Sequence, residues 1–599
     1  MSQSIFRQIR RQRLSRTGFD LSHNYKLTCD MGKLYPILIQ DIVPGDTFKV
    51  KSSIFARLAP MIAPMMSRVK IYVHYFFVPK RLVWDHWKEF ITNQPQDQSR
   101  VNAIEAEKSG TYTPPEYPYF RITNEEIKEN PTNIFYSGSL ADYLGFPVFD
   151  KNNADGRMSL NDKDYHIIDA LPFRAYHLIC NEYFRDQNVE KPYHLRLDDD
   201  GEQPMERGWM TDLLTLRYRC WKKDYFTSAL PFAQAGPDVE LPMSGDASIF
   251  TTRKDNFRIG FDKSFKLSSG KQDAFRSNGE SYSDGSYPLN TGWIGPRPDY
   301  EDHYGELGIT FTDANGTRQE GALLDVPRDA DGRSLYVLSP ETVADSLGVD
   351  LSSVNSATIN ELRRAMAAQR FLEAEARGGS RYIEELYSIF GVRSSDGRLQ
   401  RPIYLGGGRQ DIVVSDVLQT SSTDDSSPQG NQAGTGASIG MAQGFKRNFE
   451  EHGYVIGLLS ILPDASYQQG MPRMFQKFDR LDHYWPQFAH LGEQEIKNSE
   501  LYYTGRLDQS NEETFGYTPR YAEYKYCPDS IHGEFRDSLS FWHLGRIFDS
   551  RPGLNRTFMH ANPSKRIFAV LDDASDHFWI NIQHNIKAIR SMPRFGTPY

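Results

Sequence analysis

The sequence predicts a mainly β protein, an antiparallel sandwich with elaborated connections between its strands. Its 599 residues include 33 Tyr, 36 Phe, 45 Gly and 33 Pro, a composition that suits strands joined by many turns. Alternating apolar residues lie near both ends of the chain, whereas helical periodicity and long polar stretches lie in the middle. Because βαβ units would spread strands and helices evenly, this order favours antiparallel pairing. A chain of this length needs either several domains or one domain with long excursions.

Three segments carry the clearest strand patterns. In "RVKIYVHYFFVP" (68–79), apolar side chains at every second position fall on one face. "EHGYVIGLLSILPD" (451–464) is mostly apolar between its polar ends, which is typical of a buried strand. From Phe578 to Ala588, apolar residues alternate with Trp579 and polar residues, so one face is expected to be buried.

The segment "LPFRAYHLICNEYFRDQNV" (171–189) predicts an amphipathic helix that begins at Pro172. Rings and aliphatic side chains recur every three or four residues along it. The polar face carries Arg174, His177, Asn181, Glu182 and Arg185. Such a face suits either a catalytic cluster or a helix clamped between two partly polar surfaces. No zinc-binding spacing and no nucleophile beside a base is present, which favours the structural interpretation.

Three other helices are expected in the middle of the chain. A short one in 137–147 ends at Gly145, and 381–391 continues helically to Gly391. The longest begins at Thr358, which forms a capping box with Glu361, and ends at Gly378.

Motifs for cofactors and metals are weak. The Gly-rich 405–411 lacks the spacing of a phosphate loop, and 329–332 is a turn because Pro327 and Leu338 would occupy the first and last ligand positions of a calcium loop. The acidic run 197–202 suits either a divalent ion or a solvated turn. The four cysteines are widely spaced, which indicates neither a disulfide framework nor a zinc site. We therefore predict no cofactor, no metal and, because no apolar run is long enough, no membrane insertion.

The net charge of −9 is unevenly distributed. Residues 246–350 contain 18 acidic and 11 basic residues, whereas the N-terminal arm, 1–24, is basic. A flexible Arg-rich arm is suited to hold nucleic acid through phosphate contacts, although it could also be a tail that only aids solubility. The residues expected to face DNA are Arg7, Arg10, Arg11, Arg13, Arg16, Lys587, Arg590 and Arg594.

Several long phrases in order resemble one family, the major capsid protein of Microviridae, in particular its gokushovirus-like branch of single-stranded DNA bacteriophages. The phrases are "SGSLADYLGFP" (137–147), "LPFRAYHLICNEYFRDQNV" (171–189), "KKDYFTSALPFAQAGPDVELP" (222–242), "QRFLEAEARGGSRYIEELYSIFGVRSSDGRLQRPIYLGGG" (369–408), "QTSSTDDSSPQGNQAGTG" (419–436) and "RPGLNRTFMHANPSKRIFAVL" (551–571). The resemblance covers the chain from residue 25 onward, except near 92–135 and 246–350.

This resemblance implies a jelly-roll subunit, 25–599, with an eight-stranded antiparallel barrel and long inter-strand insertions that contain helices and loops. It implies a non-enzymatic protein of the virion that assembles in the host cytoplasm into a T=1 icosahedral homo-oligomer around a circular single-stranded DNA genome. An internal scaffolding protein, a DNA pilot protein and a small basic packaging protein are the implied partners. The excursion 92–135 would lie on the surface.

The insertion 246–350 coincides with the region that forms threefold protrusions in the family. It could contact a host cell-surface receptor, or it could protect the shell or lock trimers. The rings expected at an attachment surface are Tyr282, Tyr287, Trp293, Tyr300 and Tyr304.

A rival from another class is a carbohydrate-active β-sandwich enzyme or lectin. The many Tyr and Trp side chains of this chain suit stacking on sugars, and a pair of carboxylates would serve glycoside hydrolysis. Nothing in the sequence brings two such carboxylates together.

Overall fold

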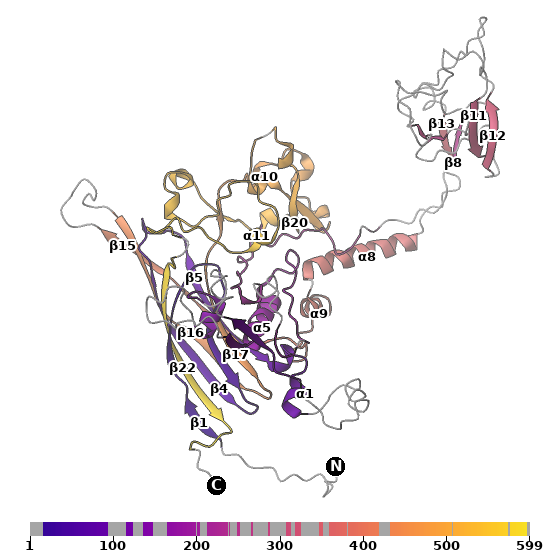
Figure 1. Ribbon diagram of the computed structural model, residues 1–599. Coiled ribbons are helices and arrows are strands. Elements are labelled where there is room, and N and C mark those ends of the chain that lie inside the picture. Colours follow the sequence, from indigo (N-terminus) through magenta and orange to yellow (C-terminus); the bar gives the residue numbers. More distant parts are fainter. Residues whose placement is uncertain are drawn as a thin grey trace, which may run out of the picture. The chain divides into compact units, whose positions relative to one another are not determined.

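The computed structural model describes residues 16–93, 115–123, 136–147, 165–198, 200–203, 212–237, 239, 359–379, 381–418, 432–505, 507–572 and 575–595, with short strands between 248 and 350 (Figure 1). The chain divides into two compact units, 1–237 with 371–599, and 238–370. The second unit is therefore an insertion in the sequence of the first. The calcium-loop candidate 329–332 and the cap residue Thr358 lie outside the described residues.

Two antiparallel sheets form the centre of the first unit (Figure 1). One has the order β1 (Thr17–Asp20), β22 (Phe578–Arg590), β4 (Thr47–Leu58), β16 (Gln432–Asn448) and β15 (Val413–Leu418), with β2 (His23–Cys29) also paired to β22. The other has the order β14 (Ile403–Asp411), β5 (Val69–Pro79), β17 (Gly453–Pro463) and β3 (Tyr35–Ile42). The prediction of a mainly β protein with antiparallel sheets and some helices is confirmed.

The strongest sequence patterns mark strands of these sheets. Strand β22 alternates buried and exposed residues from Phe578 to Ile589, and every residue of β17 is buried. Strand β17 lies between β5 and β3, where both of its faces are covered. The Gly-rich segment is strand β14 rather than a phosphate loop. A Cβ at Gly407 would lie 2.3 Å from the carbonyl oxygen of Val73 on the neighbouring strand, so this pairing requires glycine.

A chain of buried polar groups joins the two sheets inside the core. The Tyr75 hydroxyl donates to Ser52 Oγ (2.5 Å), which lies 2.7 Å from His584 Nδ1, and His584 Nε2 lies 2.9 Å from the Ile37 carbonyl oxygen. A carbonyl only accepts, so Nε2 carries the proton and Nδ1 accepts from the Ser52 hydroxyl. Burial lowers the pKa of His584 to about 4. The imidazole is therefore neutral near pH 7, with both nitrogens satisfied.

The helix predicted at 171–189 is α5 (Leu171–Ile179), which continues as a π-helical turn, Cys180–Phe184. It is buried on both its apolar and its polar face. Arg174 donates to the Val83 carbonyl and to Gln203, and His177 Nε2 lies 2.6 Å from the Leu213 carbonyl oxygen. Burial is the main cause that holds the pKa of His177 well below its usual value. Arg174 and His177 of the polar face are fully buried in protein, as the structural interpretation requires.

The other predicted helices are α4 (Leu140–Leu144), α8 (Ile359–Gly378) and α9 (Tyr382–Phe390). Gly145 and Gly391 end the first and last of them in the left-handed conformation, with φ of 91° and 68°. Helix α1 (Trp87–Thr92) follows β5, and β6 (Tyr119–Thr123) pairs with β7 (Tyr165–Asp169).

A layer of loops and short elements from the C-terminal third of the chain lies beyond one end of the long strands (Figure 1). It contains β19 (Glu493–Lys497) paired with β20 (Thr514–Pro519), β18 (Ser466–Tyr467) paired with β21 (Asp529–Ser530), α10 (Asn498–Leu501) and α11 (Arg556–Met559). This layer has a hydrophobic core of its own. The core residues are Tyr225, Phe226, Ala229, Tyr467, Ile496, Leu501, Phe515, Phe558 and Met559.

Among the described residues of the second unit, six short strands form three antiparallel pairs. They are β8 (Ser248–Thr251) with β13 (Leu347–Asp350), β9 (Phe265–Lys266) with β10 (Ser286–Tyr287), and β11 (Leu307–Thr312) with β12 (Arg318–Leu324).

Candidate nucleic-acid interface

The face of the six-stranded sheet that is turned away from the subunit's hydrophobic core carries a set of exposed cations. Strands β2, β4, β16 and β22 each bury one face against the core and turn alternate residues outward. We define the basic sheet face by these outward cations, Lys26, Lys49, Lys51, Arg57, Lys446 and Lys587.

The strand register brings three of these lysines into one row. Lys587 on β22 is opposite Lys49 on β4, and Lys49 is opposite Lys446 on β16. Neighbouring strands lie about 4.8 Å apart, and directly opposite like charges destabilise a sheet. A polyanion beside this row would offset the repulsion between the three lysines.

Carboxylates do little to neutralise this face. Within the described part of the chain, none of the six cations forms an ion pair closer than 4.0 Å. Asp20 on β1 lies opposite Lys587. Hydrogen bonds from Ser22 are the main cause that lowers the pKa of Asp20, with a smaller contribution from the charge of Lys587. The row still carries more positive than negative charge.

Rings and amides lie between the cations. Trp579, 47% exposed, is opposite Arg57, and the Arg57 guanidinium lies 5.2 Å from the centre of the Phe55 ring. Asn581, Gln583 and Asn585 are the outward residues of β22 between Trp579 and Lys587. A hollow of about 540 Å³ lies beside this end of the sheet, lined in part by Lys26, Phe55, Arg57 and Trp579. Cations that bind phosphates, beside rings on which bases stack, form the usual surface for single-stranded nucleic acid.

The structure describes four of the eight residues that the sequence predicted to face DNA. Three of these four are exposed: Arg16, Lys587 and Arg594. The fourth is Arg590, which has contacts within the protein. The other four lie outside the described residues: Arg7, Arg10, Arg11 and Arg13.

Arg590 has structural contacts at the end of β22. Its Nε lies 3.4 Å from Asp46, it donates to the Asp41 carbonyl (2.8 Å), and its guanidinium lies over the Phe48 ring. Strand β1 pairs Thr17 with Arg590, so the last part of the basic arm (1–24) joins the sheet beside β22.

Sequence reasoning missed most of the basic sheet face. The signal was present in "TFKVKSSIFAR" (47–57), where Lys49, Lys51 and Arg57 alternate with apolar residues. Such alternation predicts that the cations share an exposed face. The alignment of this strand with Lys446 and Lys587, hundreds of residues away, could not be predicted.

Two other sites were predicted from the sequence, the attachment surface and the acidic run 197–202. Tyr282, Trp293, Tyr300 and Tyr304 lie outside the described residues, and Tyr287 is described only as part of strand β10. In the acidic run 197–202, the Asp200 carboxylate accepts from Trp84 Nε1 and contacts His86 Nδ1, each at 2.8 Å. These contacts are those of a structural turn.

The described residues contain no group of three or more His, Cys, Asp or Glu side chains placed to hold a metal ion. None of their helices is long and apolar enough to cross a bilayer.

Two antiparallel sheets over a buried core and an exposed cationic sheet face together define a mainly β protein that presents a cationic surface. Comparison with known proteins gives a more specific result. The sequence profile of the family described as "Capsid protein (F protein)" matches residues 7–599.

Three curated relatives match almost end to end. The chain is 34% identical to capsid protein VP1 of Chlamydia phage 1 over 627 residues, covering 99% of this chain and 97% of the relative. It is 35% identical to capsid protein VP1 of Bdellovibrio phage phiMH2K over 609 residues, covering 100% and 98%. It is 27% identical to capsid protein VP1 of Spiroplasma virus 4 over 614 residues, covering 99% and 97%.

The chain therefore belongs to the phage capsid protein (F protein) family, within the gokushovirus-like Microviridae. It is a structural protein of the virion and not an enzyme, which excludes the alternative of a carbohydrate-active enzyme.

Proposed function

We propose that copies of this chain assemble into a T=1 icosahedral shell around a circular single-stranded DNA genome, with the basic sheet face toward the DNA. The row formed by Lys587, Lys49 and Lys446 carries this proposal. Dense negative charge stabilises adjacent lysines, and a single-stranded DNA genome supplies such charge whereas solvent does not. The basic arm 1–24 would reach the same space, because β1 joins the sheet beside Lys587.

We further propose that the subunit is an eight-stranded jelly roll. In chain order, the eight strands are β2, β3, β4, β5, β14, β16, β17 and β22. Numbered one to eight, they pair as 1-8-3-6 in one sheet and 2-7-4-5 in the other, every neighbour antiparallel. Two interleaved Greek keys produce this order, which supports a jelly roll.

Other components of the particle are proposed from the same reasoning. The basic arm and basic sheet face supply few cations relative to the phosphates of a genome, so a small basic packaging protein would supply further countercharge. An internal scaffolding protein and a DNA pilot protein would act during assembly and delivery.

The lysine row is tested by replacing its three members, Lys49, Lys446 and Lys587, with alanine. We expect the full-length chain to bind single-stranded DNA more weakly. The slope of log binding constant against log salt concentration should also become less steep by about 2, because each of the three lost phosphate contacts contributes about 0.7 to the slope. The measurement is fluorescence anisotropy of a labelled oligonucleotide over a salt series.

Two comparisons make this test specific. Replacing the exposed Lys88, Lys222 and Lys525, which lie outside the sheet, removes the same charge and should leave the slope nearly unchanged. Trp579→Ala should weaken binding about tenfold through lost base stacking and leave the slope unchanged. Equal salt slopes for the sheet and control variants would refute the proposed orientation of this face.

For residues 246–350 we propose a role in host attachment, supported by their net negative charge and their content of Tyr and Trp. Deleting 270–310 should leave particles intact and reduce adsorption to host cells by tenfold or more. The measurement is the fraction of particles bound to cells. Unchanged adsorption by intact particles would instead favour a protective or trimer-locking insertion.

A further inference from the structure

One surface segment of the first unit has its polar and apolar side chains reversed. In residues 473–478, "RMFQKF", the cationic side chains point into the protein and the apolar side chains point to solvent. Met474 is 64% exposed, Phe475 61% and Phe478 89%. A soluble surface normally has the opposite arrangement.

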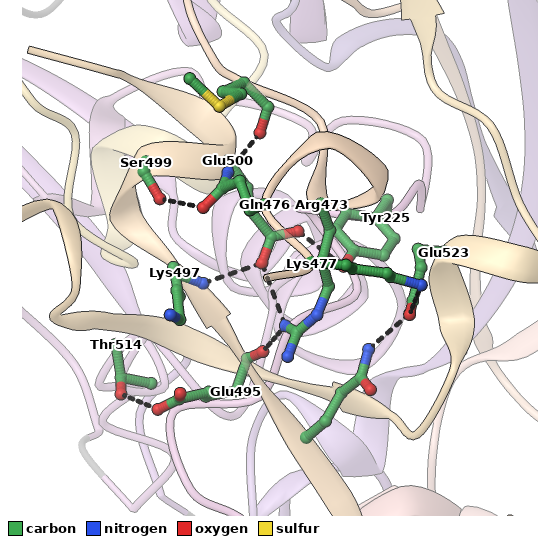
Figure 2. A network of polar contacts seen from close by, with 12 residues as sticks. Tyr225, Arg473, Gln476, Lys477, Glu495, Lys497, Ser499, Glu500, Thr514 and Glu523 are labelled. Carbon is green, nitrogen blue, oxygen red and sulfur yellow. Dashed lines mark hydrogen bonds and ion pairs between the residues drawn. The ribbon is translucent and has the colours of Figure 1, made fainter. Parts of the chain in front are cut away.

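Buried ion pairs hold the inward side chains (Figure 2). Arg473 lies 3.1 Å from Glu500, whose carboxylate also accepts from the Tyr225 hydroxyl and the Lys497 backbone N–H. Lys477 lies 3.0 Å from Glu523, with side chains only 5% and 9% exposed. The apolar side chains between these anchors are thereby fixed outward, so the segment cannot turn them into the core without breaking the ion pairs.

The exposed apolar surface continues along the chain. Leu481, Tyr484 and Leu491 are each about half exposed, with exposures of 56%, 49% and 53%. With the three outward residues above they present roughly 740 Å², if each such residue has about 200 Å² when fully exposed. We call these six residues the apolar segment. This summed area approaches the roughly 800 Å² that one partner contributes to a stable interface.

The charges around the apolar segment indicate the kind of partner. Asp479 and Asp482 accept hydrogen bonds from nearby backbone N–H groups, and the Arg480 guanidinium lies 5.1 Å from the centre of the Trp485 ring. Two acids and one base give this surface no excess of positive charge. It is therefore unsuited to a nucleic acid or an anionic membrane and suited to an apolar protein surface.

We propose that a second copy of this chain covers the apolar segment in the assembled shell, an inference that rests on the proposed shell function. A capsid subunit has other copies of itself as its most abundant neighbours. The apolar area is sufficient for such a contact, and the buried ion pairs preorganise it before assembly.

The test places the photocrosslinking residue p-benzoylphenylalanine at position 478, which is exposed enough for the subunit to fold normally. Irradiated particles should yield a species of twice the chain mass in which both linked peptides come from this chain, and unassembled subunits should not. A link within one chain, to DNA or to another virion protein, or no link at all, would overturn the inference.

Phe478→Asp provides a second, independent measurement. Particle yield should fall at least tenfold with an unchanged thermal unfolding midpoint of the free subunit. Leu507→Asp, at a residue 98% exposed outside the segment, should change the yield by less than twofold. Equal yields for Phe478→Asp and the unmodified chain, equal losses in both variants, or a lower unfolding midpoint would contradict the inference. If the unmodified chain formed no shells with its partner proteins, the proposed function itself would fail.

Discussion

Replacing Arg174 with alanine is expected to lower the free energy of unfolding of the subunit by about 3–4 kcal/mol. Arg174 on α5 is fully buried, and its guanidinium donates to the Val83 carbonyl (3.2 Å) and to Gln203 Oε1 (2.5 Å). Removing it leaves a cavity and two buried acceptors that lose their donors. Chemical denaturation of the unassembled subunit, followed by circular dichroism, measures the effect.

The exposed Arg57→Ala is the matched control, and its stability should change by less than about 0.5 kcal/mol. The comparison also tests whether the polar side chains of α5 have a structural role. Normal stability of the Arg174 variant would mean that the polar face of α5 is not structural, and the interpretation of this helix would be wrong.

Acid is expected to destabilise the subunit between pH 6.5 and pH 4, and His584 should account for about 3 kcal/mol of the loss. Burial lowers the pKa of His584 to about 4 in the folded chain, whereas an unfolded histidine titrates near 6.5. In this window the unfolded chain binds a proton that the folded chain does not bind, so stability falls as the pH falls. Above pH 6.5 both states are neutral, and below pH 4 the loss is complete.

Other histidines contribute in the same direction. Burial lowers the pKa of His74 to about 4, and it also lowers the pKa values of His177, His452 and His543. The contribution of His584 is therefore measured by difference. His584→Gln should be less stable at pH 8, because the polar chain between the sheets is broken, yet it should lose less stability than the unmodified chain on going to pH 4.5.

The measurement is a series of denaturant unfolding curves between pH 8 and pH 4.5, with His490→Gln as the exposed control. A His584→Gln variant with the same pH dependence as the unmodified chain would show that protonation of His584 does not link acid to unfolding.

The elements that sequence predicted are those whose pattern is local. Strand β22 alternates over nearly its whole length, β17 is buried throughout, and α9 ends at Gly391, as predicted. In each case the pattern repeats every two to four positions, because side chains at that spacing lie on the same face of a strand or helix. Such a pattern can be seen directly in the sequence.

The remaining features depend on contacts between distant segments. Ser52 and His584 are hydrogen-bonded although 532 positions separate them, and the sequence of either strand alone gives no partner for the other. Likewise, the local pattern of 473–478 would place Met474 and Phe478 inward. The buried Glu500 and Glu523 reverse this orientation by holding Arg473 and Lys477.

The candidate interface shows the same division. Alternation within β4 is visible in the sequence, so an exposed basic strand could be predicted. The row of three lysines requires the pairing of β4 with β16 and β22, strands that are far apart in the chain. The excess of arginine near the N-terminus drew attention to the arm, whereas the cations on the sheet are scattered through the sequence.

The central claim, that this chain is the subunit of a closed shell around DNA, is tested most directly by electron microscopy of native particles, with their absorbance ratio at 260 and 280 nm. The account predicts uniform closed shells of icosahedral symmetry with the absorbance of nucleic acid. Small particles free of nucleic acid, persisting when the chain is coexpressed with a scaffolding protein, would contradict it.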